Sequence, residues 1–256
     1  MEKAGSGVVK KVFEVIKAFV DEQQEWGVRD LSRHLGMPKS TMHRLLTQLQ
    51  DEGVLEFNHA TRKYRIGVEM VRISSVVASN IDLIKIARPF MRKLVEKYNE
   101  TICLVMYHKQ TKKIAFVEKM QGSQPLQYVI HLGELQPIPY GATGKSILAF
   151  LNPEEIEQIL SDEGFAGEKL EEVRRELMTI RKNGYAITQN QRIEGARGIG
   201  APIFNAAGEP LASLVYTVPI ARFREEQKDD IVADITAAAG QISNILGYQR
   251  TGEKQA

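Results

Sequence analysis

Apolar residues recur with a helical period in two short runs between residues 28 and 49. Val28, Leu31 and Leu35 stand at i, i+3 and i+7, which places them on one face of a short helix. Gly36 follows where helices commonly end in the left-handed conformation, and Pro38 suits the first turn of a second helix. The second run predicts an amphipathic helix whose apolar face carries Met42, Leu45, Leu46 and Leu49.

A strand-like pattern follows this pair of predicted helices. Residues 55–57 and 64–66 alternate between apolar and polar, and the polar residues 58–63 separate them. Two helices joined by a tight turn and followed by a hairpin are the layout of a winged helix-turn-helix, which places one helix in the major groove of DNA. A preceding helix over residues 8–20 is expected to pack beneath it through Val9, Val12, Ile16 and Val20.

The face of the second helix opposite its apolar stripe is polar and basic at its N-terminal end. Arginine pairs bidentately with guanine, and hydroxyl groups reach bases or phosphates, so this face is a candidate for DNA contact. The hairpin tip and the start of the first helix add basic residues that suit phosphate. The predicted DNA-binding residues are Arg29, Lys39, Ser40, Thr41, His43, Arg44, Arg62 and Lys63. The alternatives are a solvated helix face and an ordinary charged hairpin.

The remaining chain shows a mixed pattern. Residues 68–87 predict one or two helices that link the first domain, 1–67, to a second, 88–256. In that second domain we expect strands over 101–107, 113–120, 127–132, 185–187, 199–204 and 210–218. Helices are expected over 88–98, 144–151, 153–160, 169–183 and 225–246. This order favours an α+β domain on an antiparallel sheet, with room for a small ligand between the sheet and its crossing loops.

Composition narrows the class of protein. The 256 residues have a net charge of +2, so DNA binding would depend on shaped contacts and on more than one copy per site rather than on bulk charge. The single Cys103 excludes an intrachain disulfide and a multi-cysteine metal site. We expect no cofactor and no metal. The absence of a signal peptide or a long apolar run predicts a cytoplasmic protein, associated with the bacterial nucleoid.

Two glycine-containing segments resemble nucleotide sites and fail on their chemistry. In GATGKS, residues 141–146, the position that a phosphate-binding loop gives to its first glycine is Pro139, which has no N–H to donate. The segment GARGIG, residues 195–200, lacks the dinucleotide spacing and opens a strand. The five histidines show no ligand spacing, and no catalytic set is apparent, so we predict that the protein is not an enzyme.

Three blocks in their order make the chain resemble the IclR family of bacterial transcriptional regulators: LGMPKSTMHRLLTQLQDEGVLE, PIPYGATGKSILAF and GYAITQNQRIEGARGIGAPIFNAAGEPLASLVYTVP. The resemblance covers nearly the whole length. It implies an N-terminal winged helix-turn-helix and a C-terminal GAF-like effector domain. It also implies a homodimer or a dimer of dimers that binds a palindromic operator in double-stranded DNA and responds to a small organic acid, aromatic acids included.

The resemblance also implies where an effector would bind, and where this chain departs from the family. The implied effector-binding residues are Tyr128, Ala142, Thr143, Thr188, Gly198, Val215 and Thr217. The family expects Asp or Ser at Thr188, Glu at Gln191, and Cys, Ser or Ala at Gly198. The free N–H groups at 142–144 suit an anion. Because Gly198 opens room, we expect an effector larger than a two- or three-carbon acid.

These observations predict a ligand-responsive DNA-binding regulator, more readily a repressor of a catabolic operon than an activator. Effector binding would act through residues 68–87 on the placement of the DNA modules. Two alternatives remain at this point. One is an enzyme or small-molecule sensor whose helix-turn-helix packs against protein. The other is a GAF-like domain with a structural role and no ligand.

Overall fold

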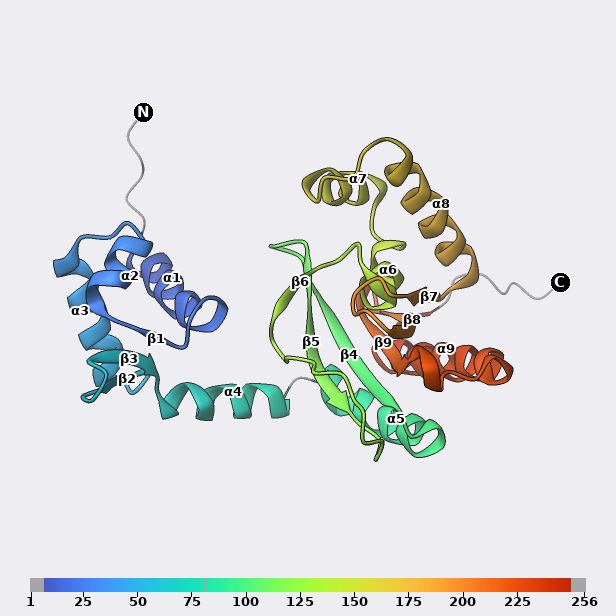
Figure 1. The fold of residues 1–256 in the computed structure, drawn as a ribbon, viewed down its shortest axis with the longest axis horizontal. Helices are drawn as coiled ribbons and strands as arrows, with labels where there is room; N and C mark the ends of the chain where they lie inside the picture. Colours follow the sequence, from blue (N-terminus) through green and yellow to red (C-terminus); the bar gives the residue numbers. More distant parts are fainter. Residues whose placement is uncertain (1–6, 81, 250–256) are drawn as a thin grey trace. The chain divides into compact units, whose positions relative to one another are not determined.

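The computed structural model describes residues 7–80 and 82–249 and divides into two compact units, Met1–Ile81 and Asp82–Ala256 (Figure 1). Helix α4 (Val68–Asn80) belongs to the first unit, and helix α5 (Asp82–Tyr98) opens the second. Residue 81, inside the segment predicted as the link, lies outside the described residues.

The N-terminal unit consists of three packed helices, a small antiparallel sheet and a fourth helix that follows the sheet. Its elements are α1 (Val8–Asp21), β1 (Glu25–Trp26), α2 (Val28–His34), α3 (Lys39–Asp51), β2 (Leu55–Asn58), β3 (Lys63–Ile66) and α4. The strands lie in the order β1-β3-β2, with Trp26 opposite Tyr64 and Phe57 opposite Tyr64 on the other side. The predicted winged helix-turn-helix is thus present, with a third strand that the sequence pattern did not indicate.

The apolar face of α3 enters the core of this unit as its period predicts. Met42, Leu45, Leu46 and Leu49 are all buried there. The prediction for α1 was wrong in part: Val9 and Val20 are exposed, whereas Val15, Ala18 and Phe19 are buried. The difference arises because valines recur around most of this helix, so the spacing alone could not decide which face turns inward.

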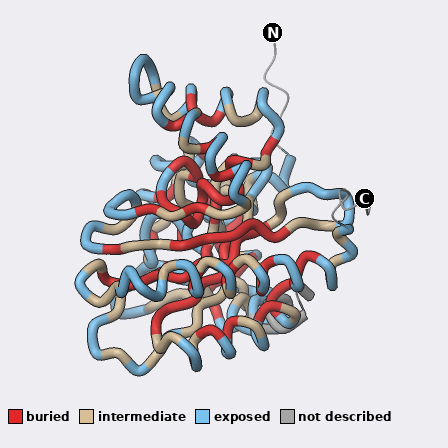
Figure 2. The backbone as a smooth tube through the Cα atoms, turned by 90° about the vertical axis from the view of Figure 1, so that its right-hand side faces the viewer, coloured by how far each residue is buried: buried red, intermediate tan, exposed pale blue. Residues whose placement is uncertain are grey.

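The C-terminal unit is built on one antiparallel sheet of six strands. They are β4 (Thr101–His108), β5 (Lys113–Met120), β6 (Leu135–Pro137), β7 (Ala186–Gln189), β8 (Ala196–Phe204) and β9 (Pro210–Pro219), in the spatial order β6-β5-β4-β9-β8-β7. The first and last strands of this unit, β4 and β9, pair at the centre, where Cys103 lies opposite Val215. Figure 2 shows that buried positions run along the central strands. The predicted α+β fold with an antiparallel sheet is confirmed.

Helices cover both faces of this sheet, so its central strands are buried on both sides. Helices α5 and α9 (Lys228–Ile245) pack on one face. Helix α6 (Gly141–Leu148) packs on the other, together with α7 (Pro153–Asp162) and α8 (Gly167–Asn183). Short 3-10 turns at Ile220–Arg222 and Glu225–Gln227 lead into α9. The near-continuous apolar runs of β4 and β9 follow from this double coverage.

The strand predicted over residues 127–132 is absent. The segment runs irregularly, and the sixth strand is instead β6, in which Gln136 lies opposite Ile114. Side chains, rather than backbone N–H groups of a neighbouring strand, donate to backbone carbonyl oxygens here. Lys119 donates from Nζ to the carbonyl oxygen of Ile130, and the Gln127 side chain donates to the carbonyl oxygen of Gly122. Tyr128, predicted to stand on this strand, therefore lies in a loop. The alternating pattern reflects the inward side chains of Tyr128 and Ile130, between which Val129 is exposed.

Three helix boundaries also differ from the prediction. Helix α5 begins at Asp82 rather than residue 88, because Pro89 lies inside the first turns of the helix and does not start it. Helix α6 spans Gly141–Leu148 rather than 144–151, since Gly141, with φ of 71°, begins the helix directly after the extended Tyr140. Helix α9 begins at Lys228, after a 3-10 turn at Glu225–Gln227.

Candidate DNA-binding surface and ligand cavity

The turn between α2 and α3 is held by local hydrogen bonds and one left-handed glycine. Gly36 has φ of 62°, as its position after the helix requires. The Ser32 hydroxyl donates to the carbonyl oxygen of Met37 at 2.6 Å, and the Met37 N–H donates back to the carbonyl oxygen of Ser32. Met37 is buried. This closed turn fixes α3 against α2, so the outward face of α3 is presented on a rigid support.

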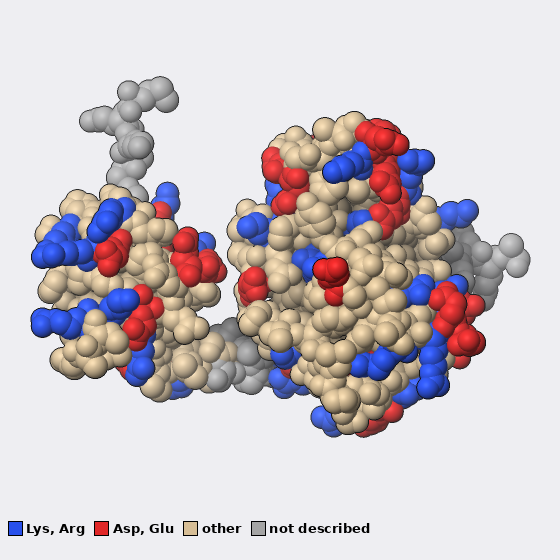
Figure 3. All heavy atoms as spheres, in the orientation of Figure 1, with Lys and Arg blue, Asp and Glu red and all other residues tan. Residues whose placement is uncertain are grey.

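That outward face carries the predicted contact residues in solvent. Lys39, Ser40, His43 and Arg44 are exposed, and Thr41 is partly buried. Figure 3 shows Lys and Arg side chains gathered along the outer edge of the N-terminal unit, over α3. Helix α3 has no acidic residue in its first turn. The arrangement leaves hydrogen-bond donors and positive charge free to meet a phosphate backbone or base edges.

The basic side chains of this unit divide into paired and unpaired ones. Arg33 is paired with Asp30 at 3.1 Å, and Arg65 with Glu56 at 3.1 Å. Within the described residues, no ion pair or side-chain hydrogen bond engages the predicted DNA-binding cations. These unpaired cations are Arg29, Lys39, Arg44, Arg62 and Lys63. The charges predicted to meet DNA are thus all among those without a counter-ion in the described part of the unit, as are Lys11 and Lys17 on α1.

The hairpin tip between β2 and β3 is shaped by an Asn side chain. The Asn58 carboxamide oxygen accepts from the N–H groups of Ala60 and Thr61, at 3.0 and 3.3 Å. Arg62 then takes a left-handed φ of 56°, and Lys63 pairs in register with Asn58. Both basic side chains are exposed. The wing therefore presents them from a defined turn rather than from a loose loop.

A cavity lies in the C-terminal unit between the sheet and the segments that cross it. Its free volume, including the solvent-filled mouth, is about 400 Å³, and only about 40 Å³ of it is accessible to a water molecule. Six of the seven predicted effector-binding residues line it: Ala142, Thr143, Thr188, Gly198, Val215 and Thr217. Tyr128 packs against the neighbouring core and does not line the cavity. Six of the residues predicted to bind an effector therefore share one cavity, and their role as ligand contacts stays a prediction.

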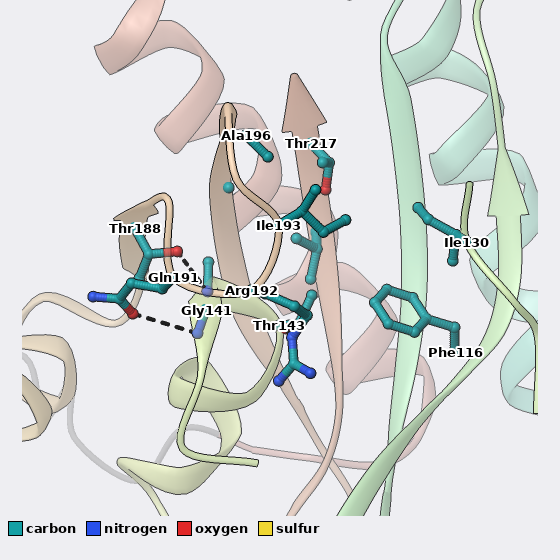
Figure 4. Close-up of a pocket in the computed structure, with 13 residues that line it drawn as sticks. Phe116, Ile130, Gly141, Thr143, Thr188, Gln191, Arg192, Ile193, Ala196 and Thr217 are labelled. Atoms are coloured by element: carbon teal, nitrogen blue, oxygen red, sulfur yellow. Dashed lines mark hydrogen bonds between the residues drawn. The ribbon is translucent and has the colours of Figure 1, made fainter. Parts of the chain in front are cut away.

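Seven further residues line the cavity that were not among the predicted effector-binding residues, although Gln191 was named as a departure from the family pattern: Phe116, Ile130, Gly141, Gln191, Arg192, Ile193 and Ala196. In Figure 4, Phe116 and Ile130 face Ile193, Thr143 and Arg192 across the cavity. Phe116 and Ile130 come from distant parts of the chain, and only the folded sheet brings them here. Arg192 had a sequence signal, because it follows Gln191 directly in the block where this chain departs from the family pattern.

The free N–H groups expected at the start of α6 are partly occupied by the chain itself. The Gly141 N–H donates to the Gln191 carboxamide oxygen at 3.3 Å, and the Ala142 N–H donates to the Thr188 hydroxyl at 2.7 Å (Figure 4). The expectation that the N–H groups of residues 142–144 are free for an anion was wrong for residue 142. The physical reason is that Thr188 and Gln191 are uncharged and within reach of the helix start, so they cap it.

Arg192 contributes the positive charge of the cavity. Its guanidinium donates from Nε to the Thr143 hydroxyl and from Nη1 to the Gln136 carboxamide oxygen, both at 2.7 Å. Its Nη2 donates to the backbone carbonyl oxygens of Pro137 and Tyr140. Burial lowers the pKa of Arg192 to about 10, which still leaves it protonated at neutral pH.

A second charged group lies one helical turn behind the cavity. Lys145 on α6 is buried and pairs with Glu176 on α8. Glu176 also accepts from the Gln191 carboxamide at 3.5 Å. The contacts link α8 through Gln191 to the Gly141 N–H at the cavity wall. A shift of the 190–195 segment, which carries Gln191, would therefore change contacts of both α8 and α6.

Comparison with known proteins places both units. The family described as bacterial transcriptional regulator IclR C-terminal matches residues 75–244, and the IclR helix-turn-helix domain matches residues 8–59. The chain belongs to the IclR family. The protein is therefore a transcriptional regulator of a family that binds DNA through its helix-turn-helix, and the resemblance described above is confirmed.

Curated relatives and solved structures of the IclR family agree with this assignment. The chain is 30% identical to the HTH-type transcriptional regulator KdgR of Dickeya chrysanthemi, over 94% of this chain and 80% of that protein. It is 31% identical to KipR of Bacillus subtilis, over 83% of this chain and 86% of that protein. The IclR regulator of Alicyclobacillus acidocaldarius shares the fold, with a TM-score of 0.83, 18% identity, and coverage of 93% of this chain and 98% of that one.

A further solved structure bears on ligands. An IclR homologue of Microbacterium hydrocarbonoxydans, crystallised in complex with 4-hydroxybenzoate, has the same fold with a TM-score of 0.77. It is 22% identical, and the match covers 94% of this chain and 99% of that one. At this identity the likeness establishes the fold.

Within the described residues, no helix is long and apolar enough to span a membrane.

Proposed function

We propose that this regulator binds an operator through α3 and the β2–β3 wing and that a small organic acid in the C-terminal cavity controls that binding. The observation that carries the proposal is the coexistence of two features in one chain. The N-terminal unit exposes five cations without counter-ions around α3 and the wing. The C-terminal unit holds a cavity of about 400 Å³ lined by apolar walls and a few polar groups.

The DNA contacts would divide into base readout and phosphate contacts. Arg44 and His43 stand on the exposed face of α3, from which a helix in the major groove reads base edges. Lys39, Arg62 and Lys63 suit phosphates. In a mobility-shift assay on DNA upstream of its own gene, Arg44→Ala should weaken specific binding by about tenfold or more, since a bidentate base contact contributes about 1–3 kcal/mol.

A matched control separates this contact from a general loss of charge. Arg33→Ala removes one cation from the same unit, but Arg33 is already paired with Asp30, so its loss should weaken binding much less than that of Arg44. If both variants weakened specific and random DNA equally, Arg44 would act only as a charge. If neither changed binding, α3 would not be the recognition helix.

The ligand is proposed to be an organic acid larger than three carbons, aromatic acids included. Ala142, Thr143, Thr188, Gly198, Val215 and Thr217 are proposed to contact it. The 4-hydroxybenzoate complex of the Microbacterium homologue supports an aromatic acid as one candidate. Because water reaches only about 40 Å³ of the cavity, we propose that such a ligand enters by displacing the 190–195 segment, which contributes Gln191, Arg192 and Ile193 to the lining. Calorimetry with small and aromatic acids tests this, and tight binding of pyruvate or glyoxylate alone would refute the size argument.

We propose further that the active species is a homodimer or a dimer of dimers on a palindromic site, acting in the cytoplasm as a repressor. The modest net charge of +2 supports more than one copy per operator. Val8, Val9, Phe13 and Val20 expose apolar surface along α1, which a second copy would cover. Multi-angle light scattering should give at least twice the monomer mass. A monomer at micromolar concentration, bound to a single half-site, would contradict this part of the proposal.

A further inference from the structure

The guanidinium of Arg192 has no acidic partner, which sets it apart from the other half-buried arginines of its unit. Arg222 pairs with Glu100 through two contacts of 2.7 Å, and Arg197 pairs with Glu225 at 2.8 Å. All four hydrogen bonds of Arg192 go to neutral oxygens. Within the described residues, the chain therefore supplies carboxylates to two of these arginines and leaves the cavity arginine uncompensated.

The cavity itself offers this charge no counter-ion either. None of the thirteen lining residues is acidic. Two polar residues of the lining, Thr188 on β7 and Gln191 after it, are neutral and already hydrogen-bonded to the start of α6. A cation that is buried without an opposite charge destabilises the fold. An anion that binds beside it therefore gains an electrostatic attraction that no group of the chain provides.

Arg192 also keeps donor capacity for a ligand. A guanidinium carries five N–H donors, and four hydrogen bonds engage Arg192, so one N–H of Nη1 remains. The two bonds from Nη2 go to neutral backbone carbonyl oxygens, and a carboxylate is a stronger acceptor for a guanidinium because it adds the attraction of a full negative charge and can pair in a bidentate way. A carboxylate could therefore take both terminal nitrogens in a bidentate pair.

We propose that Arg192 is the anion receptor of the cavity and that a ligand carboxylate pairs with its guanidinium as the counter-ion that the chain does not supply. The proposal rests on the ligand-binding role given to this cavity above. It specifies the ligand class: an acid whose uncharged part fits the apolar wall of Phe116, Ile130 and Val215, with its carboxylate directed to the side where Arg192 and Thr143 lie.

The same pairing would couple occupancy to the position of the crossing segment. Without ligand, Arg192 ties the 190–195 segment to the 136–143 segment through Gln136, Pro137, Tyr140 and Thr143. A carboxylate that replaces Pro137 and Tyr140 as acceptors of Nη2 would release two of these ties. The start of α6, against which Arg192 lies, would then be free to adjust, so binding and conformation change together.

The test compares acids with their neutral amides on the full-length protein. We would measure the thermal stability of the wild type with sodium benzoate, sodium 4-hydroxybenzoate and sodium pyruvate, each against its amide, with sodium chloride at equal ionic strength. At least one acid should raise Tm where its amide does not. In Arg192→Gln this preference should fall by about tenfold or more in affinity, and Arg192→Lys should retain part of it.

Two controls keep the outcome clear. Arg181→Gln removes an exposed cation from the same unit and should keep the acid preference of the wild type. If Arg192→Gln is too unstable to measure, Arg192→Lys is compared with the wild type instead. Lysine cannot form the planar bidentate pair with a carboxylate, so this variant should bind the acid more weakly than the wild type, and an unchanged affinity would overturn the proposal. Retained acid preference in Arg192→Gln would also overturn it.

The failure of this inference differs from the failure of the ligand-binding role. If an acid and its amide bind the wild type equally, the cavity takes ligands and Arg192 is not an anion receptor. If no compound of the panel binds the wild type, both the inference and the assigned role of the cavity are overturned for these ligand classes. Arg192→Gln with normal acid binding and altered stability alone would reduce the residue to a structural tie.

Discussion

Gly198 is the position where one added methyl group should separate ligand binding from folding. A Cβ built there lies 3.3 Å from the Ala142 Cβ and 3.7 Å from the Thr188 hydroxyl oxygen. Both neighbours line the cavity. The first distance is slightly inside the optimum for two carbon atoms, about 3.5–4.0 Å, so a small shift of Ala142 relieves it. The change Gly198→Ala thus reduces the cavity with little strain.

The expected effect on stability is close to zero. Glycine inside a strand is less favourable than alanine by about 0.5–1 kcal/mol, and the tight contact with Ala142 costs a similar amount. The free energy of unfolding should therefore change by less than about 1 kcal/mol. A ligand that uses the space at Gly198 should lose about tenfold in affinity or more, since an overfilled site costs about 1–3 kcal/mol.

Gly144→Ala is the contrasting change. A Cβ at Gly144 would lie 1.9 Å from the Ile138 carbonyl oxygen, which belongs to the backbone and cannot turn away. We expect a loss of about 3 kcal/mol or more, confined to the C-terminal unit. The one tryptophan, Trp26, lies in the N-terminal unit, so its fluorescence should show unchanged unfolding of that unit. Circular dichroism should show the lower stability of the C-terminal unit. Unaltered ligand affinity in Gly198→Ala, or a normal Gly144→Ala, would refute the packing described for this cavity.

Three further changes test the wing and one ion pair. Arg62→Gly should leave the free energy of unfolding unchanged or raise it by up to about 1 kcal/mol, because a left-handed φ of 56° is strained for arginine. The same change should reduce the slope of log affinity for DNA against log salt concentration by about one. An unchanged slope would show that Arg62 does not contact phosphate. Asn58→Ala, which loses two hydrogen bonds in the turn, should weaken DNA binding without removing a charge, as a binding titration would show. The hydrogen bond from Arg197 lowers the pKa of Glu225 in the folded state, so this pair stabilises the fold above the usual value of 4.5 and the effect is lost as pH falls through the lowered pKa. Glu225→Gln should therefore lower Tm at pH 7, with a difference from the wild type that closes in acid; a constant difference across pH would contradict the pairing.

The sequence predicted the N-terminal unit well because its signals are local. The run of Met42, Leu45 and Leu49 together with Gly36 determines a helix and its turn without help from distant residues. For α1 the same reasoning failed, since valines surround the helix and only the packed structure turns Val15 inward. The unpaired state of Arg44, in contrast to the pairing of Arg33 with Asp30, also required the folded side chains.

In the C-terminal unit, the family pattern located the cavity, and the structure was needed for its chemistry. The alternation over residues 127–132 predicted a strand, but the Lys119 side chain takes the Ile130 carbonyl oxygen, and no ladder forms. The helix start at Ala142 has the form of an anion site, and only the fold shows that Thr188 already occupies its N–H. The place of Arg192 in the cavity could not be predicted either, because its neutral hydrogen-bond partners come from a segment some fifty residues earlier in the chain.

The most direct measurement is the affinity of the full-length protein for its operator with and without an acid that binds the cavity, at one fixed salt concentration. If the two units form a switch, saturating acid changes the operator Kd by at least about fivefold, and operator DNA changes the affinity for the acid by the same factor, because the coupling between two binding equilibria is reciprocal. An operator Kd that stays the same at saturating acid would contradict the claim that the cavity controls DNA binding.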